Sequence, residues 1–272
     1  MSKNNGAFSF KLTFLGTGTS IGIPVPACRC PVCRSLSPRN RRSRCSALLE
    51  AAGRHILIDT SPEFRLQALK NRIHKLDAVL WTHAHADHLH GLDDLRAFSW
   101  KHPVEGYTSE NTAREIKERF SYLWKVTQKG GGKAQVNLNA VPPCRPFTAE
   151  NLSPLEIIPV PLIHGRLPIY GWRCGPVAYL TDLSQIPPES YPLLQNLKIL
   201  VLGALRFKPH PTHLNIERAL EEIKKIRPEK AYLTHISHEA SHRQIRRALP
   251  PNVHPAFDGL VVRTSGELFR RH

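Results

Sequence analysis

The chain has 272 residues, of which 41% are hydrophobic, enough for a buried core. No run approaches the ~18 consecutive apolar residues of a membrane span, and the N-terminal segment around Lys3 lacks the apolar region of a secretion signal. We therefore expect a cytoplasmic protein with no membrane partner. Lys and Arg outnumber Asp and Glu by 38 to 22, which favours an anionic substrate or partner.

Short apolar runs rich in strand-forming residues alternate with helical periodicity along the chain. The predicted strands are Phe8–Leu15, Ser46–Leu49, His55–Ile58, Ala78–Trp81, Leu155–Pro159, Val177–Leu180, Ile199–Leu202, Ala231–Leu233 and Gly259–Thr264. The clearest helices are Asn111–Tyr122 and Ile216–Ile226, where apolar residues recur at three- and four-residue spacing. This alternation indicates a layered α/β protein. Without a repeat or a linker, residues 1–272 are predicted to form a single domain.

The densest chemical signal follows the strand Ala78–Trp81, where His83, His85, Asp87 and His88 lie within six positions. We expect His83 and His85, two residues apart on a strand, to point to the same side. A turn into a helix would then bring Asp87 and His88 from another direction. Imidazole pairs with a carboxylate are typical ligands of Zn²⁺ and related ions, so this segment predicts a site for two metal ions.

Three more candidate ligands lie just after apolar strands or in loops. They are His164, Asp182 and His235. Each alone would more often be an ordinary loop or core residue, and the chain has 15 His, so chance matches are easy. The three residues are candidates because they recur at strand ends, where layered α/β proteins carry functional residues.

The segment from His83 to His88 matches the HxHxDH signature of the metallo-β-lactamase superfamily, and the chain therefore resembles that superfamily. The resemblance implies an αββα sandwich with a dinuclear metal site at its edge. By the same resemblance, one metal would be held by His83, His85 and His164, and the other by Asp87, His88 and His235. Asp182 would bridge the two ions, which would be Zn or Mn.

Further segments resemble one branch of that superfamily, the phosphoribosyl cyclic phosphodiesterase (PhnP) branch. They are Leu15 to Pro24, the Cys28-x-Cys30-x-x-Cys33 cluster, Pro38 to Arg42, and Thr234 to His238. The branch hydrolyses a ribosyl 1,2-cyclic phosphate in phosphonate breakdown. A zinc held by three Cys and one His is one of its marks, and the matching residues here are Cys28, Cys30, Cys33 and His238.

The cysteine cluster supports a zinc site on its own residues as well. Three thiolates in a loop with a distant His form a Cys₃His set, and structural zinc sites are closed by four ligands. We predict such a site in the loop 24–45, with a redox pair or inert buried thiols as the alternatives. The other cysteines, Cys45, Cys144 and Cys174, show no partner pattern and are expected in the core.

Two adjacent metals lower the pKa of a shared water, so that a hydroxide can attack phosphorus at neutral pH. The sequence therefore predicts a phosphodiesterase acting on a small, cyclic phosphodiester through a dinuclear-metal hydroxide. His213 and Asp87 are the candidate catalytic residues. His213 precedes the helix Ile216–Ile226 and corresponds by resemblance to a His beside the metals, the predicted proton donor; the alternative is a capping residue that only packs.

Other functions remain open at this stage. A tRNA 3′-end endonuclease or other nuclease of the same fold is favoured by the positive charge, but no long basic arm is present. A non-catalytic metal-binding module and thioester or lactam hydrolysis are further alternatives, because a fold does not fix a function. A homodimer is compatible with the sequence.

The most basic run of the chain is Arg39 to Arg44. It could form a phosphate or nucleic-acid patch, or it could be a solvated loop. The run has no interleaved aromatic residues for base stacking, so we favour the solvated loop.

Overall fold

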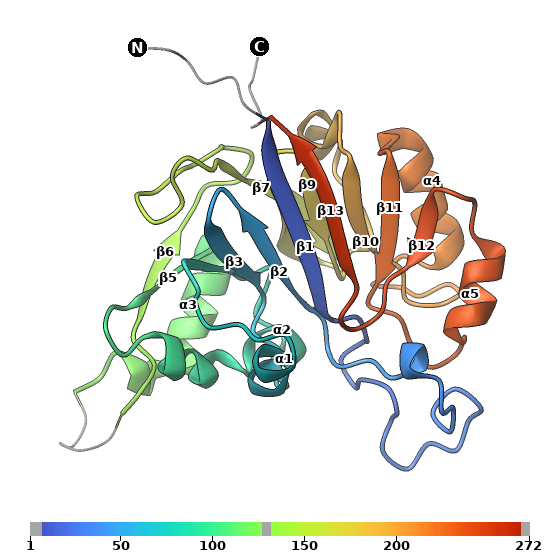
Figure 1. Ribbon diagram of the computed structural model, residues 1–272, viewed down its shortest axis with the longest axis horizontal. Coiled ribbons are helices and arrows are strands. Elements are labelled where there is room, and N and C mark those ends of the chain that lie inside the picture. The colour runs from blue at the N-terminus through green and yellow to red at the C-terminus, as the bar shows by residue number, and fades with distance from the viewer. Residues whose placement is uncertain (1–6, 127–131, 268–272) are drawn as a thin grey trace.

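Two β-sheets packed face to face form the centre of the protein, and helices cover both outer faces (Figure 1). The computed structural model describes residues 7–126 and 132–267. The two ends of the predicted 1–272 domain, including the N-terminal segment at Lys3, lie outside the described residues. The arrangement confirms the predicted αββα sandwich of the metallo-β-lactamase type. Within the described part of the chain, every helix is too short or too polar to cross a membrane.

The first sheet has seven strands in the order β13-β1-β2-β3-β4-β5-β6. Its strands are β1 (Phe8–Gly16), β2 (Ser46–Ala51), β3 (Arg54–Ile58), β4 (Ala78–Leu80), β5 (Val104–Thr108), β6 (Val136–Ala140) and β13 (Val261–Gly266). The helices α1 (Phe64–Lys70), α2 (Ala86–Leu89) and α3 (Glu110–Arg119) follow strands of this sheet. Strands β3 to β6 are parallel, so the loops after β3 and β4 leave the sheet at the same edge.

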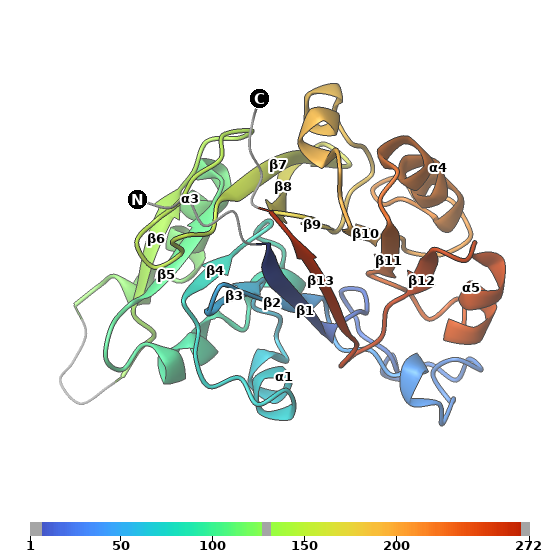
Figure 2. The ribbon, with the colours of Figure 1, turned by 45° about the horizontal axis from the view of Figure 1, so that its top comes forward.

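The second sheet has six strands in the order β12-β11-β10-β9-β8-β7. Its strands are β7 (Ile157–His164), β8 (Leu167–Cys174), β9 (Val177–Leu180), β10 (Ile199–Gly203), β11 (Lys230–Thr234) and β12 (Val253–Pro255). Strands β9 to β12 are parallel. The helices α4 (Ile216–Ile226) and α5 (His242–Ala248) lie near β11 and β12 (Figure 2).

Three apolar clusters hold the layers together. Phe10 and Phe14 of β1 pack between the sheets with Trp172 and Tyr179 of the second sheet. One outer cluster joins the first sheet to α1 and α3, and the other joins the second sheet to α4 and α5. Fixed packing on both faces of each sheet leaves the loops at the strand ends as the segments that can vary in chemistry.

The helix Ile216–Ile226 has the predicted bounds, because local signals specify both of its ends. The Asn215 side chain accepts a hydrogen bond from the backbone N–H of Arg218, and Arg227 ends the helix in the left-handed region. The predicted helix Asn111–Tyr122 is shifted: α3 covers Glu110–Arg119, and a 3₁₀ turn follows.

Several elements were missing from the prediction, and their sequences explain why. Strands β5, β6, β8 and β12 contain glycine, asparagine or proline, which weaken the strand pattern. In β5, Gly106 leaves room for the ring of Trp81, since an added Cβ would lie 2.3 Å from a ring carbon. Strand β7 runs beyond the predicted Pro159 through Pro161 to His164; as an edge strand it tolerates both prolines.

Candidate metal centre

The candidate metal centre lies where loops leave the ends of both sheets. His83 and His85 follow β4, and Asp87 and His88 lie on the short helix α2. His164 ends β7, Asp182 follows β9, and His235 follows β11. The predicted placement of His83 and His85 on a strand was wrong: β4 ends at Leu80, and both residues lie in the loop after it. The turn into a helix before Asp87 is present as predicted.

The seven predicted ligands meet in two groups. In the first, one side-chain nitrogen each of His83, His85 and His164 lies within 4.8 Å of the others. In the second, ligand atoms of Asp87, His88, Asp182 and His235 lie within the same limit. Asp182 also lies within this distance of His164 and His213, so it stands between the two groups.

Ligand atoms of the second group approach one another without forming hydrogen bonds. His88 Nε2 lies 3.2 Å from Asp87 Oδ2, and His235 Nε2 lies 3.2 Å from Asp182 Oδ2. Yet His88 Nε2, Asp87 Oδ2 and His235 Nε2 are buried atoms without a hydrogen-bond partner, as is His83 Nε2 of the first group. Buried polar atoms without a partner are costly, so this set indicates a group that would satisfy them together.

The spacing of these atoms matches divalent metal binding. Four ligands around zinc at about 2.0–2.1 Å stand about 3.3 Å apart in a tetrahedron. The four nitrogen–oxygen distances in the second group lie between 3.2 and 3.5 Å. Nitrogen and carboxylate oxygen are also the donor types that zinc and manganese accept. The residues present therefore fit a divalent ion.

A hydrogen-bonded chain behind the ligands fixes the orientation of their rings. His88 Nδ1 donates to Asp59 Oδ2 at 2.7 Å, and the Thr82 hydroxyl donates to the same carboxylate at 2.9 Å. The Thr82 oxygen lies 2.9 Å from His83 Nδ1 and can accept a hydrogen bond from that ring N–H. On the other side of the site, His164 Nδ1 donates to the backbone carbonyl of Thr212 at 2.7 Å. In all three rings the Nε2 atom is left for a metal.

Asp59 and Thr82 are functional residues that the sequence analysis missed. Both side chains are fully buried, and Asp59 directly follows β3. The signal was available, because a carboxylate after an apolar strand is the same pattern that pointed to Asp182. Asp59 was passed over because it lies 24 positions before His83, and only the parallel pairing of β3 with β4 brings the two together.

Three residues of this site have a strained backbone. Asp59, Asp182 and His235 have φ angles of 62°, 57° and 55°, in the left-handed region that favours glycine. A side chain held there costs of order 1–3 kcal/mol and persists only where the surrounding structure enforces it. At these three positions the surrounding structure holds the side chain toward the cluster in spite of that cost.

The charges of the cluster are strongly coupled. Burial alone would raise the pKa of Asp182, but His235 and His88 beside it hold that pKa well below the ordinary value. Burial would lower the pKa of His88, and three carboxylates, those of Asp182, Asp87 and Asp59, raise it well above the ordinary value. Burial and the neighbouring His88 lower the pKa of His83. The lowered pKa of Asp182 favours its ionised form, which is the form that binds a metal.

His213 lies against the ligand rings. Its ring centroid is 4.6 Å from that of His164 and 5.0 Å from that of His235, and it stacks on the latter. His213 does not cap α4, because Asn215 is the N-cap of that helix. Burial, followed by the nearby His235, lowers the pKa of His213 to about 3.

The four residues of the predicted Cys₃His set meet in a second, separate cluster. His238 Nδ1 lies 3.4 Å from Cys28 Sγ and 3.5 Å from each of Cys30 Sγ and Cys33 Sγ. A tetrahedral zinc with three sulfur ligands and one nitrogen ligand would set these distances at about 3.5 Å. The backbone N–H of Cys33 lowers the pKa of Cys30 to about 6, which favours the thiolate, whereas burial raises the pKa of Cys33 to about 11.

The other cysteines lie apart from this cluster. Cys45 and Cys174 are buried, as expected of core residues, whereas Cys144 is half-buried.

The basic run Arg39 to Arg44 is not the simple solvated loop that we favoured. Arg42 is only 2% exposed. Its guanidinium donates to the Thr17 hydroxyl and to the Ala256 carbonyl, each at 2.7 Å, so it ties the loop 24–45 to segments at both ends of the chain. Arg44 pairs with Glu63. Arg39 and Arg41 are the exposed members of the run.

Comparisons with known proteins agree with this geometry. The family model described as "Beta-lactamase superfamily domain" matches residues 54–236. A crystal structure titled as a new diphosphatase from the PhnP family is 40% identical, with a TM-score of 0.89, and the match covers 97% of this chain and 100% of that one. Human tRNase Z, short form, shares the fold at 21% identity and a TM-score of 0.64, over 93% of this chain and 98% of that chain.

Among curated proteins, an octanoyltransferase from Porphyromonas gingivalis is 41% identical over 249 residues. The match covers 90% of this chain but 50% of that protein, so this chain spans half the length of that relative. With the family model over residues 54–236 and the full-length structural match, the chain belongs to the metallo-β-lactamase superfamily and, within it, to the PhnP family.

Proposed function

We propose that this chain is a metal-dependent hydrolase whose substrate is a small phosphodiester or diphosphate. The observation that carries the proposal is the cluster of seven His and Asp side chains, four of which have a buried ligand atom without a hydrogen-bond partner. The likeness to a PhnP-family diphosphatase over the full length of both chains supports a phosphorus centre as the point of attack.

The ligand sets follow from the two groups of side chains. His83, His85 and His164 would hold one divalent ion, and Asp87, His88 and His235 the other, with Asp182 shared between them. Bound there, zinc or manganese would supply a nucleophilic hydroxide at neutral pH and neutralise charge on the phosphoryl oxygens.

The remaining polar residues prepare the site and handle the leaving group. The Asp59–Thr82 pair fixes the tautomer and angle of His88 and His83, so no reorganisation is needed when substrate enters. His213 lies beside both ligand groups and is the proposed donor of a proton to the departing oxygen. A phosphoryl anion next to its ring would raise the pKa of His213, which couples protonation to substrate binding.

The Cys28, Cys30, Cys33 and His238 cluster is proposed as a structural zinc site. Four donors close a tetrahedron and leave no position for substrate. His238 lies three residues beyond His235, so a zinc here would tie the loop 24–45 to the segment that carries a catalytic ligand.

Two substrate types remain within the proposal. Hydrolysis of a cyclic phosphodiester requires departure of a sugar alkoxide, which is a poor leaving group. His213 would then protonate the departing oxygen. A diphosphate releases phosphate, which needs little protonation, and the diphosphatase of the PhnP family favours this second type.

The test is a substrate panel with the purified, metal-loaded protein. The panel contains a ribosyl 1,2-cyclic phosphate, nucleoside cyclic phosphates, bis-p-nitrophenyl phosphate, a sugar diphosphate ester, phosphomonoesters, pre-tRNA and an octanoyl thioester. We expect turnover of the cyclic phosphodiester or the diphosphate to exceed that of the monoesters and of pre-tRNA. Preferred turnover of the thioester, or none of any substrate with metals bound, would contradict the proposal.

A further inference from the structure

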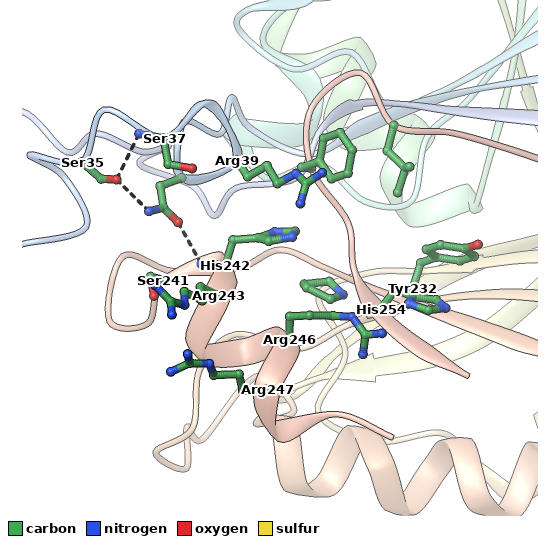
Figure 3. A pocket seen from close by; sticks show the side chains of 14 residues that line it. Ser35, Ser37, Arg39, Tyr232, Ser241, His242, Arg243, Arg246, Arg247 and His254 are labelled. Carbon is green, nitrogen blue, oxygen red and sulfur yellow. Dashed lines mark hydrogen bonds between the residues drawn. The ribbon is translucent and has the colours of Figure 1, made fainter. Parts of the chain in front are cut away.

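A hollow of the molecule lies apart from the candidate metal centre. It is a cavity of about 770 Å³ between α5, the loop before β2 and the segment after β12 (Figure 3). None of its lining residues is a candidate metal ligand. Pockets of this volume commonly hold small-molecule ligands, so this cavity is a candidate second binding site.

The lining of this cavity is strongly basic. It includes four arginines and two histidines, and no Asp or Glu. Among residues 7–126 and 132–267, the ion pairs involve other arginines, and Arg39, Arg243, Arg246 and Arg247 take part in none. Unpaired guanidinium groups around a concave wall focus positive potential and favour a multiply charged anion.

The pKa values of the two histidines in the wall are lowered, in part by the nearby cations. Burial, then the cations Arg42, Arg39 and Arg246, lowers the pKa of His242 to about 4. His254 is shifted in the same direction by burial, Arg246 and Lys230.

Flat rings share the wall with these cations. The guanidinium of Arg39 lies 5.1 Å from the ring centre of Phe257, and the rings of Tyr232 and His254 are 5.5 Å apart. Figure 3 shows the side chains of Arg39 and Arg246 on facing walls, both extending toward Tyr232 and His254. The basic run lacks interleaved aromatics in the sequence, but the fold supplies them from β11, β12 and the segment that follows β12.

We propose that this cavity binds a nucleotide, with its phosphates between Arg39 and Arg246 and its base against the rings of Phe257 and Tyr232. Guanidinium groups bind phosphate oxygens in pairs, and an aromatic face accepts any base. The nucleotide is either free in solution or one unit of a nucleic-acid strand. This site is independent of the proposed hydrolysis.

The cavity wall is built partly by the loop that carries the cysteine cluster. The Asn40 side chain accepts a hydrogen bond from the backbone N–H of His242 at 2.8 Å, and its amide donates to Ser35 at 2.9 Å. Buried Arg42 reaches His242 from behind at 3.3 Å. The positions of Arg39 and α5 are thus fixed relative to each other before a ligand arrives.

The test measures binding of fluorescent ATP, tripolyphosphate and a single-stranded 12-nucleotide RNA to the metal-loaded protein at fixed salt. The double variant Arg39→Gln/Arg246→Gln should lose roughly tenfold or more in affinity, because two charge-assisted contacts are removed. The matched control is Arg114→Gln/Arg218→Gln, which removes two exposed arginines that do not line the cavity. Equal losses in both variants would show binding by net charge alone and overturn the site.

Two further measurements separate the parts of the proposal. His85→Ala, which alters the metal centre, should retain ATP binding; loss of binding there would place the nucleotide in the metal centre and overturn the cavity. Phe257→Leu should weaken ATP more than tripolyphosphate, whereas equal weakening would overturn the role of the base. RNA binding at least tenfold tighter than ATP would assign the cavity to a strand, and the reverse order to a free nucleotide.

Discussion

The two clusters of potential metal ligands differ in how the chain builds them. The Cys₃His cluster takes three ligands from one loop, Cys28 to Cys33, and one from the segment after β11. The His/Asp cluster takes seven residues from the ends of β4, β7, β9 and β11 and from α2. Three thiolates and one imidazole would close a tetrahedron around one ion, whereas the larger cluster offers five imidazoles and two carboxylates, with the exposed ring of His85 at its rim.

This difference indicates separate tasks for neighbouring segments. His235 and His238 are three residues apart, yet the first joins the open cluster and the second the closed one. Asp182 and His235, two ligands of the open cluster, have strained φ angles, as does Asp59 behind His88. The comparison predicts that changes at the open cluster abolish chemistry, and that changes at the closed cluster reduce stability.

The largest effect on turnover is expected from Asp182→Asn. Loss of the shared carboxylate should reduce phosphodiester turnover by more than the ~10²–10⁴-fold that a single positioned acid contributes. Bound metal, measured by mass spectrometry, should fall from three ions per chain toward the one at the cysteine cluster. The control Glu221→Gln removes an exposed carboxylate on α4 and should change neither value. Full metal content in Asp182→Asn would show that Asp182 is not a shared ligand.

His213→Ala tests the proton donor. Turnover of a ribosyl or alkyl phosphodiester should fall by about 10²–10⁴-fold, and turnover of bis-p-nitrophenyl phosphate much less, because p-nitrophenolate departs without protonation. Metal content should stay unchanged. The control is His210→Ala, whose ring lies 5.0 Å from that of His213 in the same loop. Equal losses on both substrates would indicate a packing or binding role, and loss of metal would make His213 a ligand.

Asp59→Asn should have an intermediate effect. The amide weakens the hydrogen bond that orients His88, and such a change typically lowers metal affinity or activity about 10–100-fold. The measurement is activity against added zinc or manganese, where excess metal should restore part of the loss. Unchanged metal affinity and activity in this variant would show that Asp59 does not support the metal site.

Cys30→Ser should have the smallest effect on chemistry. Zinc content should fall by one ion per chain, and the thermal midpoint should drop by roughly 5 °C or more, because a closed zinc site contributes folding free energy. The molecules that stay folded should retain turnover. Arg29→Ser, an exposed neighbour in the same loop, is the control. An unchanged midpoint and zinc content would count against the structural zinc.

Much of the open cluster could be predicted from the sequence because its ligands are local or follow strong strands. His83 to His88 form a continuous motif, and Asp182 and His235 come just after β9 and β11, which are buried apolar runs. The helix Ile216–Ile226 was also specified locally, by its apolar period and its caps. The cysteine spacing placed three donors in one loop without any knowledge of the fold.

Other features depend on contacts between distant segments, and only the tertiary structure decided them. Asp59 becomes a support of His88 through the parallel pairing of β3 with β4, and Arg42 becomes a buried anchor through Thr17 and Ala256. The basic cavity joins the residue run before β2 to α5 and to aromatic rings more than 190 positions away in the chain. Periodicity and spacing describe neighbours along the chain, whereas burial, backbone strain and electrostatic potential are set by neighbours in space.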